Sequence, residues 1–204
     1  MTITSFEFLL FMTLVFFLYW VLCKKSKTLQ NGLLVMASLV FYGWWDWKCL
    51  GLLLVTAFST YFAARLMDKN KTDDRKRWWL SFGAIVLNLG ILVYFKYSNF
   101  FIQSFVDAFS LFGKKLSVST LKIILPVGIS FYTFSALSYS IDVYAKRTAA
   151  TNDVLAYLAY VTFFPAILSG PISRSTKQLP QYFERRIFYY ENIVSGCKSI
   201  LWGG

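Results

Sequence analysis

The chain has no histidine among its 204 residues, and it has few charged side chains and few cysteines. Histidine is the residue whose ordinary pKa lies nearest to neutrality, so the usual general base of an enzyme is missing from this sequence. The three cysteines, Cys23, Cys49 and Cys197, are odd in number and lack the spacing of metal ligands, which argues against a disulfide framework and against a metal site. Cys197 has no partner base near it in sequence, so it is a poor candidate for a nucleophile.

The shortage of charge also argues against a soluble globular protein. Charged residues make up 15% of the chain and hydrophobic residues 57%, whereas soluble domains have roughly 25% and 45–50%. The apolar residues form runs close to the ~20 residues that a helix needs to cross a bilayer. The composition therefore predicts an all-α, polytopic transmembrane helical bundle. The net charge of +11 comes from basic residues in short gaps between the runs, which indicates topology signals rather than a surface for nucleic acid.

The runs predict a single transmembrane domain over residues 1–204. The predicted spans are 6–22, 29–45, 49–67, 78–95 and 121–144, with a re-entrant segment at 153–170 and an amphipathic helix at 179–202. No basic residue precedes the first span, whereas three lysines follow it and five Lys or Arg residues lie in 68–77. Because cytoplasmic loops carry the excess of basic residues, we predict a multi-pass protein of the cell membrane with its N-terminus outside. Residues 97–112 are predicted to form a further helix at the outer interface.

The predicted span 121–144 carries a stripe of small and polar residues. Gly128, Ser135 and Asp142 recur every seven residues, and Ser138 lies on the same face. In a bilayer such a stripe must face other helices or a wet cavity, because small residues permit close packing and an ionisable group is costly against hydrocarbon. Two interpretations stay open: helix packing, with Asp142 merely at the cytoplasmic end, or a functional polar surface.

The segment 153–170 is interrupted by proline. Pro165 lies within it, and Gly170 and Pro171 end any helix. Counting Lys and Arg on each side favours a segment that enters and leaves on the cytoplasmic side. Irregular backbone at membrane depth survives only where protein or water satisfies its polar groups, so we expect this segment to line a cavity.

Four stretches carry a resemblance to a known family. They are YGWWDW (42–47), FKYSNFF (95–101), LPVGISFYTFSALSYSIDVY (125–144) and FFPAILSGPISR (163–174). Their order and spacing resemble the membrane-bound O-acyltransferases, most closely the bacterial alginate O-acetyltransferase branch, which is related to the D-alanyl transfer protein of teichoic acid. The resemblance implies a membrane enzyme that moves an acyl group from a cytoplasmic donor, acetyl-CoA or an acyl carrier, to a hydroxyl of an exported glycan. It also implies the lipid bilayer as environment, periplasmic or extracellular acetylation proteins as partners, and neither a bound cofactor nor nucleic acid.

The family's catalytic histidine belongs to the later half of a longer chain, and this sequence has none. A sugar hydroxyl is a poor nucleophile, so a group that titrates near neutrality must take its proton as the acyl carbonyl is attacked. Asp142 is the one carboxylate on the polar stripe, and a carboxylate is ordinarily too weak a base for this role. We therefore expect the 204 residues to be the N-terminal portion of the enzyme and to be inactive when isolated.

The resemblance implies that this portion encloses the substrate. Residues that are candidates for lining the mouth where the donor enters are Pro165, Ser169, Gly170, Pro171 and Arg174. The guanidinium of Arg174 offers a planar fork to a phosphate or carboxylate. The alternative for Arg174 is an interfacial residue that only marks the inner face of the membrane.

Two other functions remain open. One is a non-catalytic membrane scaffold that binds a partner enzyme through residues 174–204. The other is a transporter-like subunit, in which the broken segment and the serine stripe form a permeation route. Against the transporter, no inverted repeat is visible in the sequence.

Overall fold

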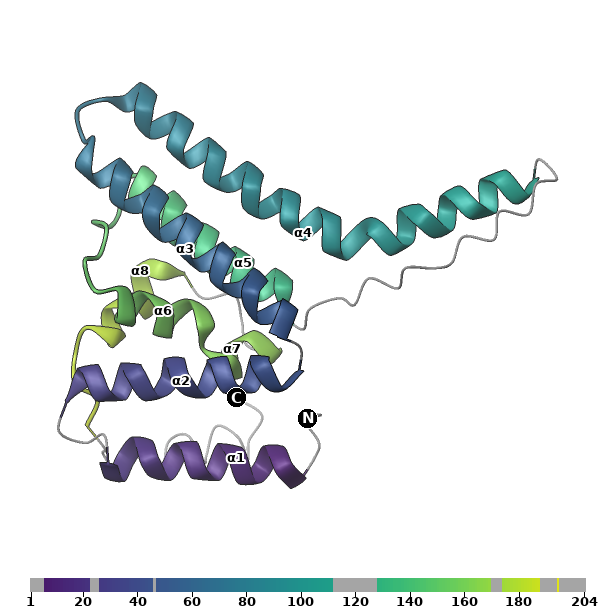
Figure 1. The fold of residues 1–204 in the computed structure, drawn as a ribbon. Helices are drawn as coiled ribbons and strands as arrows, with labels where there is room; N and C mark the ends of the chain where they lie inside the picture. The colour runs from purple at the N-terminus through teal and green to yellow at the C-terminus, as the bar shows by residue number, and fades with distance from the viewer. Residues whose placement is uncertain are drawn as a thin grey trace.

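A computed structural model describes residues 6–22, 26–45, 47–111, 128–169, 174–187 and 194. In these residues the regular structure is entirely helical and no strand is present (Figure 1), which confirms the predicted all-α fold class. The elements are α1 (Phe6–Phe17) with a π-helical turn (Leu18–Leu22), α2 (Lys27–Trp45), α3 (Trp47–Lys69), α4 (Asp74–Leu111), α5 (Ile129–Tyr144), α6 (Val154–Thr162), α7 (Phe164–Ser169), α8 (Ser175–Gln178) and a 3₁₀ helix (Leu179–Tyr182).

Two groups of helices enclose a third. Helices α3, α4 and α5 pack against one another, and α1 packs on α2. The short helices α6, α7 and α8 lie between these two groups (Figure 1), where α6 contacts α2 and α5 contacts all three short helices. The polar stripe of α5 therefore has helical neighbours along its whole length.

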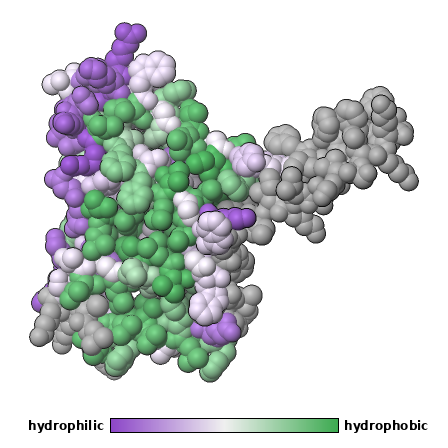
Figure 2. Space-filling model, in the orientation of Figure 1, coloured by the Kyte–Doolittle hydropathy of each residue, from purple (hydrophilic) through white to green (hydrophobic). Residues whose placement is uncertain are grey.

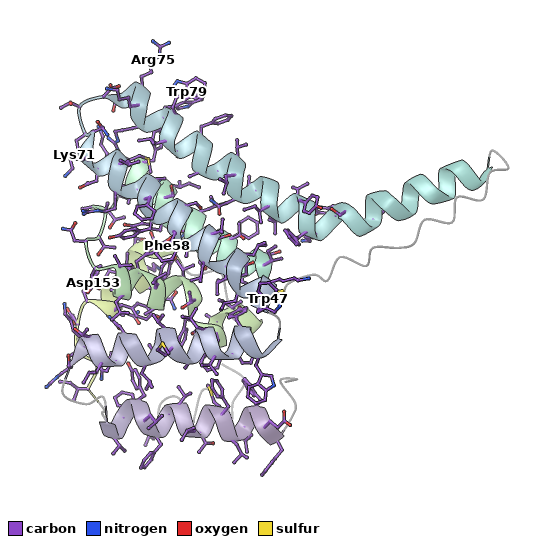
Figure 3. All side chains as sticks on the ribbon, in the orientation of Figure 1. Trp47, Phe58, Lys71, Arg75, Trp79 and Asp153 are labelled. Atoms are coloured by element: carbon purple, nitrogen blue, oxygen red, sulfur yellow. The ribbon has the colours of Figure 1, made fainter. Side chains whose placement is uncertain are left out.

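Two regions of the described chain are long and apolar enough to cross a membrane, Trp47–Lys69 and Asp74–Ser98. Shorter apolar helical stretches are Phe6–Val21 and Val154–Ile167. Figure 2 shows hydrophobic residues across the middle of one face and hydrophilic residues along one edge. Lys71 and Asp153 lie at that edge, and Trp47 lies at the other end of α3 (Figure 3). The α3–α4 connection and the loop after α5, which both carry basic residues, line one cleft, and the assignment of that side to the cytoplasm stays a prediction.

The helix α4 differs from its prediction. Residues 97–111 continue the same helix that begins at Asp74, so this stretch is not a separate interfacial helix. The helix changes direction along its course, and its far end projects away from the other helices (Figure 1). Glycine and proline are absent between 91 and 111, and without such breakers the helix propagates. The interfacial position of its end stays a prediction.

The segment 153–170 consists of two short helices, α6 and α7, that are separated at Phe163. Asp153 caps α6 because its carboxylate accepts the backbone N–H of Ala156 (3.0 Å). Pro165 has no N–H to donate, and it stands in the first turn of α7, where a helix tolerates it. The chain is therefore broken two residues before the proline, and the re-entrant course in a membrane stays a prediction.

The amphipathic helix predicted at 179–202 is wrong for residues 183–187. Leu179–Tyr182 is a single 3₁₀ turn, and residues 183–187 are not helical. The backbone of Arg186 bonds instead to the Gln30 side chain, whose amide donates to the Arg186 carbonyl (2.8 Å) and accepts from its N–H (3.0 Å). These bonds replace the intrahelical pairing. Apart from Val194, the rest of 188–202 lies outside the described residues.

Asp73 starts α4. The backbone N–H of Lys76 donates to the Asp73 carboxylate (3.0 Å), and the Lys76 ammonium lies 3.1 Å away. These contacts, the backbone hydrogen bond first, hold the pKa of Asp73 below its ordinary value of 3.8. Because the folded-state pKa is lowered, the stabilisation of this helix start is present above that ordinary value and is lost as pH falls through the lowered pKa.

We expect the Asp73→Ala variant to exchange the backbone amides of the first turn of α4 faster than wild type at neutral pH, as measured by hydrogen–deuterium exchange. In the wild type the same acceleration should set in only as Asp73 becomes protonated in acid. Asp68→Ala is the matched control, because Asp68 lies in the last turn of α3 and pairs with Lys71 (3.3 Å). Equal protection of this turn in Asp73→Ala and wild type would contradict the capping role.

Candidate functional site

The polar stripe of α5 begins at Gly128, which has a left-handed backbone (φ 72°). A Cβ on this residue would lie 2.0 Å from Cγ2 of Ile167 and 2.9 Å from the Ile167 carbonyl oxygen, both on α7. It would also lie 3.3 Å from the hydroxyl of Tyr42 on α2. Only glycine satisfies both the conformation and the spacing, so Gly128 fixes how closely the start of α5 approaches α7 and α2.

The two serines of the stripe contact the next elements. The Tyr160 hydroxyl of α6 donates to the backbone carbonyl of Ser135 (3.1 Å). The backbone N–H of Ser175, the first residue of α8, donates to the Ser138 hydroxyl (3.3 Å). Hydrogen bonds of this kind hold membrane helices together, where apolar side chains gain little by leaving lipid for protein.

Asp142 is the ionisable member of the stripe, and it is buried. Its carboxylate accepts the hydroxyl of Ser175, and Nη1 of Arg147 lies 3.5 Å from its Oδ1. A buried carboxylate is costly unless it is paired and hydrogen-bonded, and both conditions are met here. Asp142 therefore joins α5 to α8 and to the loop that follows α5.

Ser175 was not predicted as a site residue. Ser175 is buried and makes two hydrogen bonds to α5. Its backbone N–H donates to the Ser138 hydroxyl, and its side-chain hydroxyl donates to the Asp142 carboxylate. No local sequence signal marked Ser175, which is the first residue of α8 and not its N-cap. Its partner on α5 is 33 residues away in sequence.

Of the five residues predicted to line a donor mouth, the structure describes the side chains of Pro165 and Arg174, and the shared role stays a prediction. Pro165 lines a cavity next to α1 and α2, whereas Arg174 precedes Ser175 and therefore lies next to the Asp142 contact. The side chain of Arg174 is exposed, and no ion pair to it is present within the described part of the chain. Ser169 ends α7 and its side chain is not described, while Gly170 and Pro171 lie outside the described residues.

A basic cleft of about 370 Å³ lies beside this contact. Its charged lining residues are Lys71, Arg77, Lys146, Arg147 and a single carboxylate, Asp68. Arg147 also contacts Asp142, so the cleft and the stripe meet at that carboxylate. Sequence reasoning assigned these basic residues to topology alone, because they lie in separate loops and only folding gathers them.

The buried end of the cleft is formed by Arg77, whose side chain is only 4% exposed. Its Nη2 donates to the carbonyl oxygens of Val143 (3.0 Å) and Tyr144 (2.8 Å), the last two residues of α5. A cation is favourable at the C-terminal end of a helix, where carbonyl groups have no intrahelical partner. Arg77 thus joins α4 to the end of α5.

The chemistry available in the described residues is that of hydrogen bonding and charge. Within them there is no group of three or more His, Cys, Asp or Glu side chains that could hold a metal ion. The carboxylate of Asp142 and the hydroxyl of Ser175 bond to each other and tie helices together. The exposed cations of the cleft, Lys71, Lys146 and Arg147, lie within ion-pair distance of Asp68, Asp74 and Asp142. This set can position a substrate through hydrogen bonds and charge.

Known proteins resemble the chain over most of its length. It is 37% identical over 180 residues to the probable alginate O-acetylase AlgI of Pseudomonas aeruginosa, covering 88% of this chain and 34% of that protein. It is 36% identical over 195 residues to the protein of the same name in Azotobacter vinelandii, covering 95% and 38%. It is 30% identical over 198 residues to the peptidoglycan O-acetyltransferase of Helicobacter pylori, covering 84% and 36%. The chain therefore spans about a third of the length of the curated relatives it matches. No family model and no solved structure matches it.

Proposed function

On the premise that this chain belongs with the O-acetyltransferases of alginate and peptidoglycan, to which it is homologous over most of its length, we propose that it forms part of a membrane enzyme that transfers an acetyl group to hydroxyls of an exported polysaccharide. The homology is the observation that carries the proposal. The enzyme is proposed to be a multi-pass protein of the cell membrane with its N-terminus outside, working with acetylation proteins beyond the membrane. Support for this topology is that basic residues of the α3–α4 connection and of the loop after α5 line one cleft.

The proton acceptor in this proposal lies outside the 204 residues. The chain has no histidine, and its buried carboxylate, Asp142, is occupied by Ser175 and Arg147. These contacts support a positioning role for the stripe, which holds α5, α6, α7 and α8 in register. The isolated chain is accordingly proposed to bind substrate without catalysing the acetyl transfer.

The donor is proposed to approach from the side of the basic cleft. Acetyl-CoA carries phosphate groups, and an acyl carrier presents a phosphate-linked arm, so either donor brings negative charge to the enzyme. Four cations line the cleft, and three carboxylates, those of Asp68, Asp74 and Asp142, lie within ion-pair distance of them, which leaves an excess of one positive charge. The exposed Arg174 directly precedes Ser175 of the Asp142 contact. Arginine pairs with phosphate through two parallel hydrogen bonds, which supports Arg174 as a residue that binds the donor.

A chimera tests the function. The matched third of the Pseudomonas aeruginosa relative is replaced by this chain, and the O-acetyl content of alginate is measured in a strain that lacks the relative. We expect the chimera to restore acetylation and the isolated chain to give none. A chimera that reaches the membrane at normal abundance and yet restores nothing would contradict the proposal and leave the scaffold and the transporter as explanations.

The role of Arg174 is tested in the same chimera. We expect Arg174→Ala to raise the KM for the acetyl donor with little change in kcat, lowering kcat/KM about 10- to 150-fold, because one charge-assisted hydrogen bond contributes about 1.5–3 kcal/mol. Arg174→Lys keeps the charge but lacks the planar guanidinium, so its kcat/KM should lie between those of wild type and Arg174→Ala. Arg185→Ala is the control, since Arg185 is also exposed. Unchanged donor kinetics in Arg174→Ala would reduce this residue to a marker of the membrane surface.

A further inference from the structure

A second cavity, of about 300 Å³, lies between α1, α2, α7 and residues 178–186. Its walls are mostly apolar. The residues that form them include Met12, Val15 and Phe16 of α1, Leu34 of α2, and Phe164 and Pro165 of α7. Pockets that bind small molecules begin at about this volume and combine apolar walls with a few polar groups. The size and lining fit a single hydrocarbon chain.

One end of the cavity is polar. Arg186 lies there with Tyr19 and Tyr182, over whose rings it stacks, and Trp20 adjoins Tyr19. This end is next to the end of α1 and the beginning of α2, because the Arg186 backbone bonds to Gln30. Aromatic and basic side chains at the ends of membrane helices are typical of the boundary between hydrocarbon and lipid headgroups. The cavity is therefore polar at one end and apolar over the rest of its length, as a lipid molecule is.

Arg186 is held in place by neutral groups. Its guanidinium donates to the side chain of Asn31 and stacks over the rings of Tyr182 (4.9 Å) and Tyr19 (5.5 Å). No carboxylate lies within ion-pair distance of it among the residues that the structure describes, and its buried Nε–H has no acceptor there. A cation that faces an apolar cavity without a counter-charge is costly. A phosphate beside the guanidinium would supply that counter-charge.

We propose that this cavity binds an anionic phospholipid, with the headgroup phosphate on Arg186 and one acyl chain along α1 as far as Phe164 and Pro165. The phosphate supplies the counter-charge to the Arg186 guanidinium. The acyl chain packs against the apolar walls. This site is separate from the basic cleft and does not depend on the acetyl-transfer proposal.

Native mass spectrometry of the full chain in detergent tests the site. The chain is stripped of lipid and titrated separately with phosphatidylglycerol, phosphatidylcholine and glycerol 3-phosphate. We expect one molecule of phosphatidylglycerol to be retained at least tenfold more strongly than phosphatidylcholine, and glycerol 3-phosphate not to be retained. Arg186→Gln should lose this preference, whereas Arg185→Gln, which changes the neighbouring exposed residue, should keep it.

A second variant separates binding from folding. Met12→Trp fills the apolar end and leaves Arg186 intact, so it should lower phosphatidylglycerol retention about as much as Arg186→Gln does. Leu14→Trp is its control, because Leu14 is 57% exposed on the same helix and does not line the cavity. The proposal is overturned by equal retention of both phospholipids, by undiminished retention in Arg186→Gln and Met12→Trp, or by retention of glycerol 3-phosphate alone, which would indicate a site for free phosphate.

Discussion

The Gly128→Ala variant is expected to lose about 2–5 kcal/mol of folding free energy, the sum of a left-handed backbone that a side chain disfavours and an overpacked contact. The added methyl group would stand 2.0 Å from Ile167 Cγ2 and 2.9 Å from the Ile167 carbonyl oxygen. The side chain can rotate away from the first contact, whereas the second requires the backbone of α7 to move. Reversible denaturation in detergent, followed by circular dichroism, measures the loss.

Two kinds of control accompany this variant. Gly83→Ala and Gly90→Ala add the same methyl group on α4, where nothing lies within 4 Å, and should be neutral or gain up to about 1 kcal/mol from helix propensity. Ile167→Ala removes the Cγ2 group, so combining it with Gly128→Ala should cost less than the sum of the two single changes. A Gly128→Ala protein as stable as Gly83→Ala would show that α5 does not pack on α7 in this way.

The Arg77→Met variant is expected to lose about 2–3 kcal/mol, because each hydrogen bond to a charged group contributes about 1.5–3 kcal/mol and the freed carbonyl groups regain part of this from water. Arg77 gives the last two carbonyls of α5 a donor that belongs to α4. Its removal should loosen the α4–α5 contact, and faster hydrogen exchange in the last turn of α5 would report this directly. The same denaturation experiment gives the total loss.

Arg75→Met is the matched control for this variant. Arg75 lies in the same turn of α4 but points away from the helices (Figure 3) and is exposed, so its loss should have little effect on stability. Arg77→Lys keeps the charge with a single donor group and should fall between wild type and Arg77→Met. If Arg77→Met and Arg75→Met are equally stable, the hydrogen bonds at the end of α5 do not stabilise the bundle.

Both predictions concern contacts that hold the candidate site. Gly128 fixes one end of α5 and Arg77 fixes the other, while Ser138 and Asp142 between them hold the start of α8. Since Arg174 directly precedes that start, a shift of α5 moves the residue proposed to bind the donor. A change remote from Arg174 therefore alters donor binding in the chimera if it displaces α5.

The sequence by itself determined the helical fold class, the regions where most helices lie and the resemblance to O-acetyltransferases. These depend on local composition and pattern: a long apolar run leaves the backbone no satisfactory partner in lipid except its own helix, and the charged residues of 68–77 end one run and begin another. The polar stripe of α5 was also visible, because helical periodicity places its members on one face.

Only the tertiary structure decided which residues meet. Asp142 bonds to Ser175, Gly128 accommodates Ile167, and Arg186 joins Asn31 across 155 positions of sequence. The same reason explains the failed predictions: residues 183–187 are not helical because a distant amide, that of Gln30, takes up the backbone groups of Arg186. Helix formation is governed by neighbours in sequence, whereas these contacts depend on how finished helices pack, which no local pattern encodes.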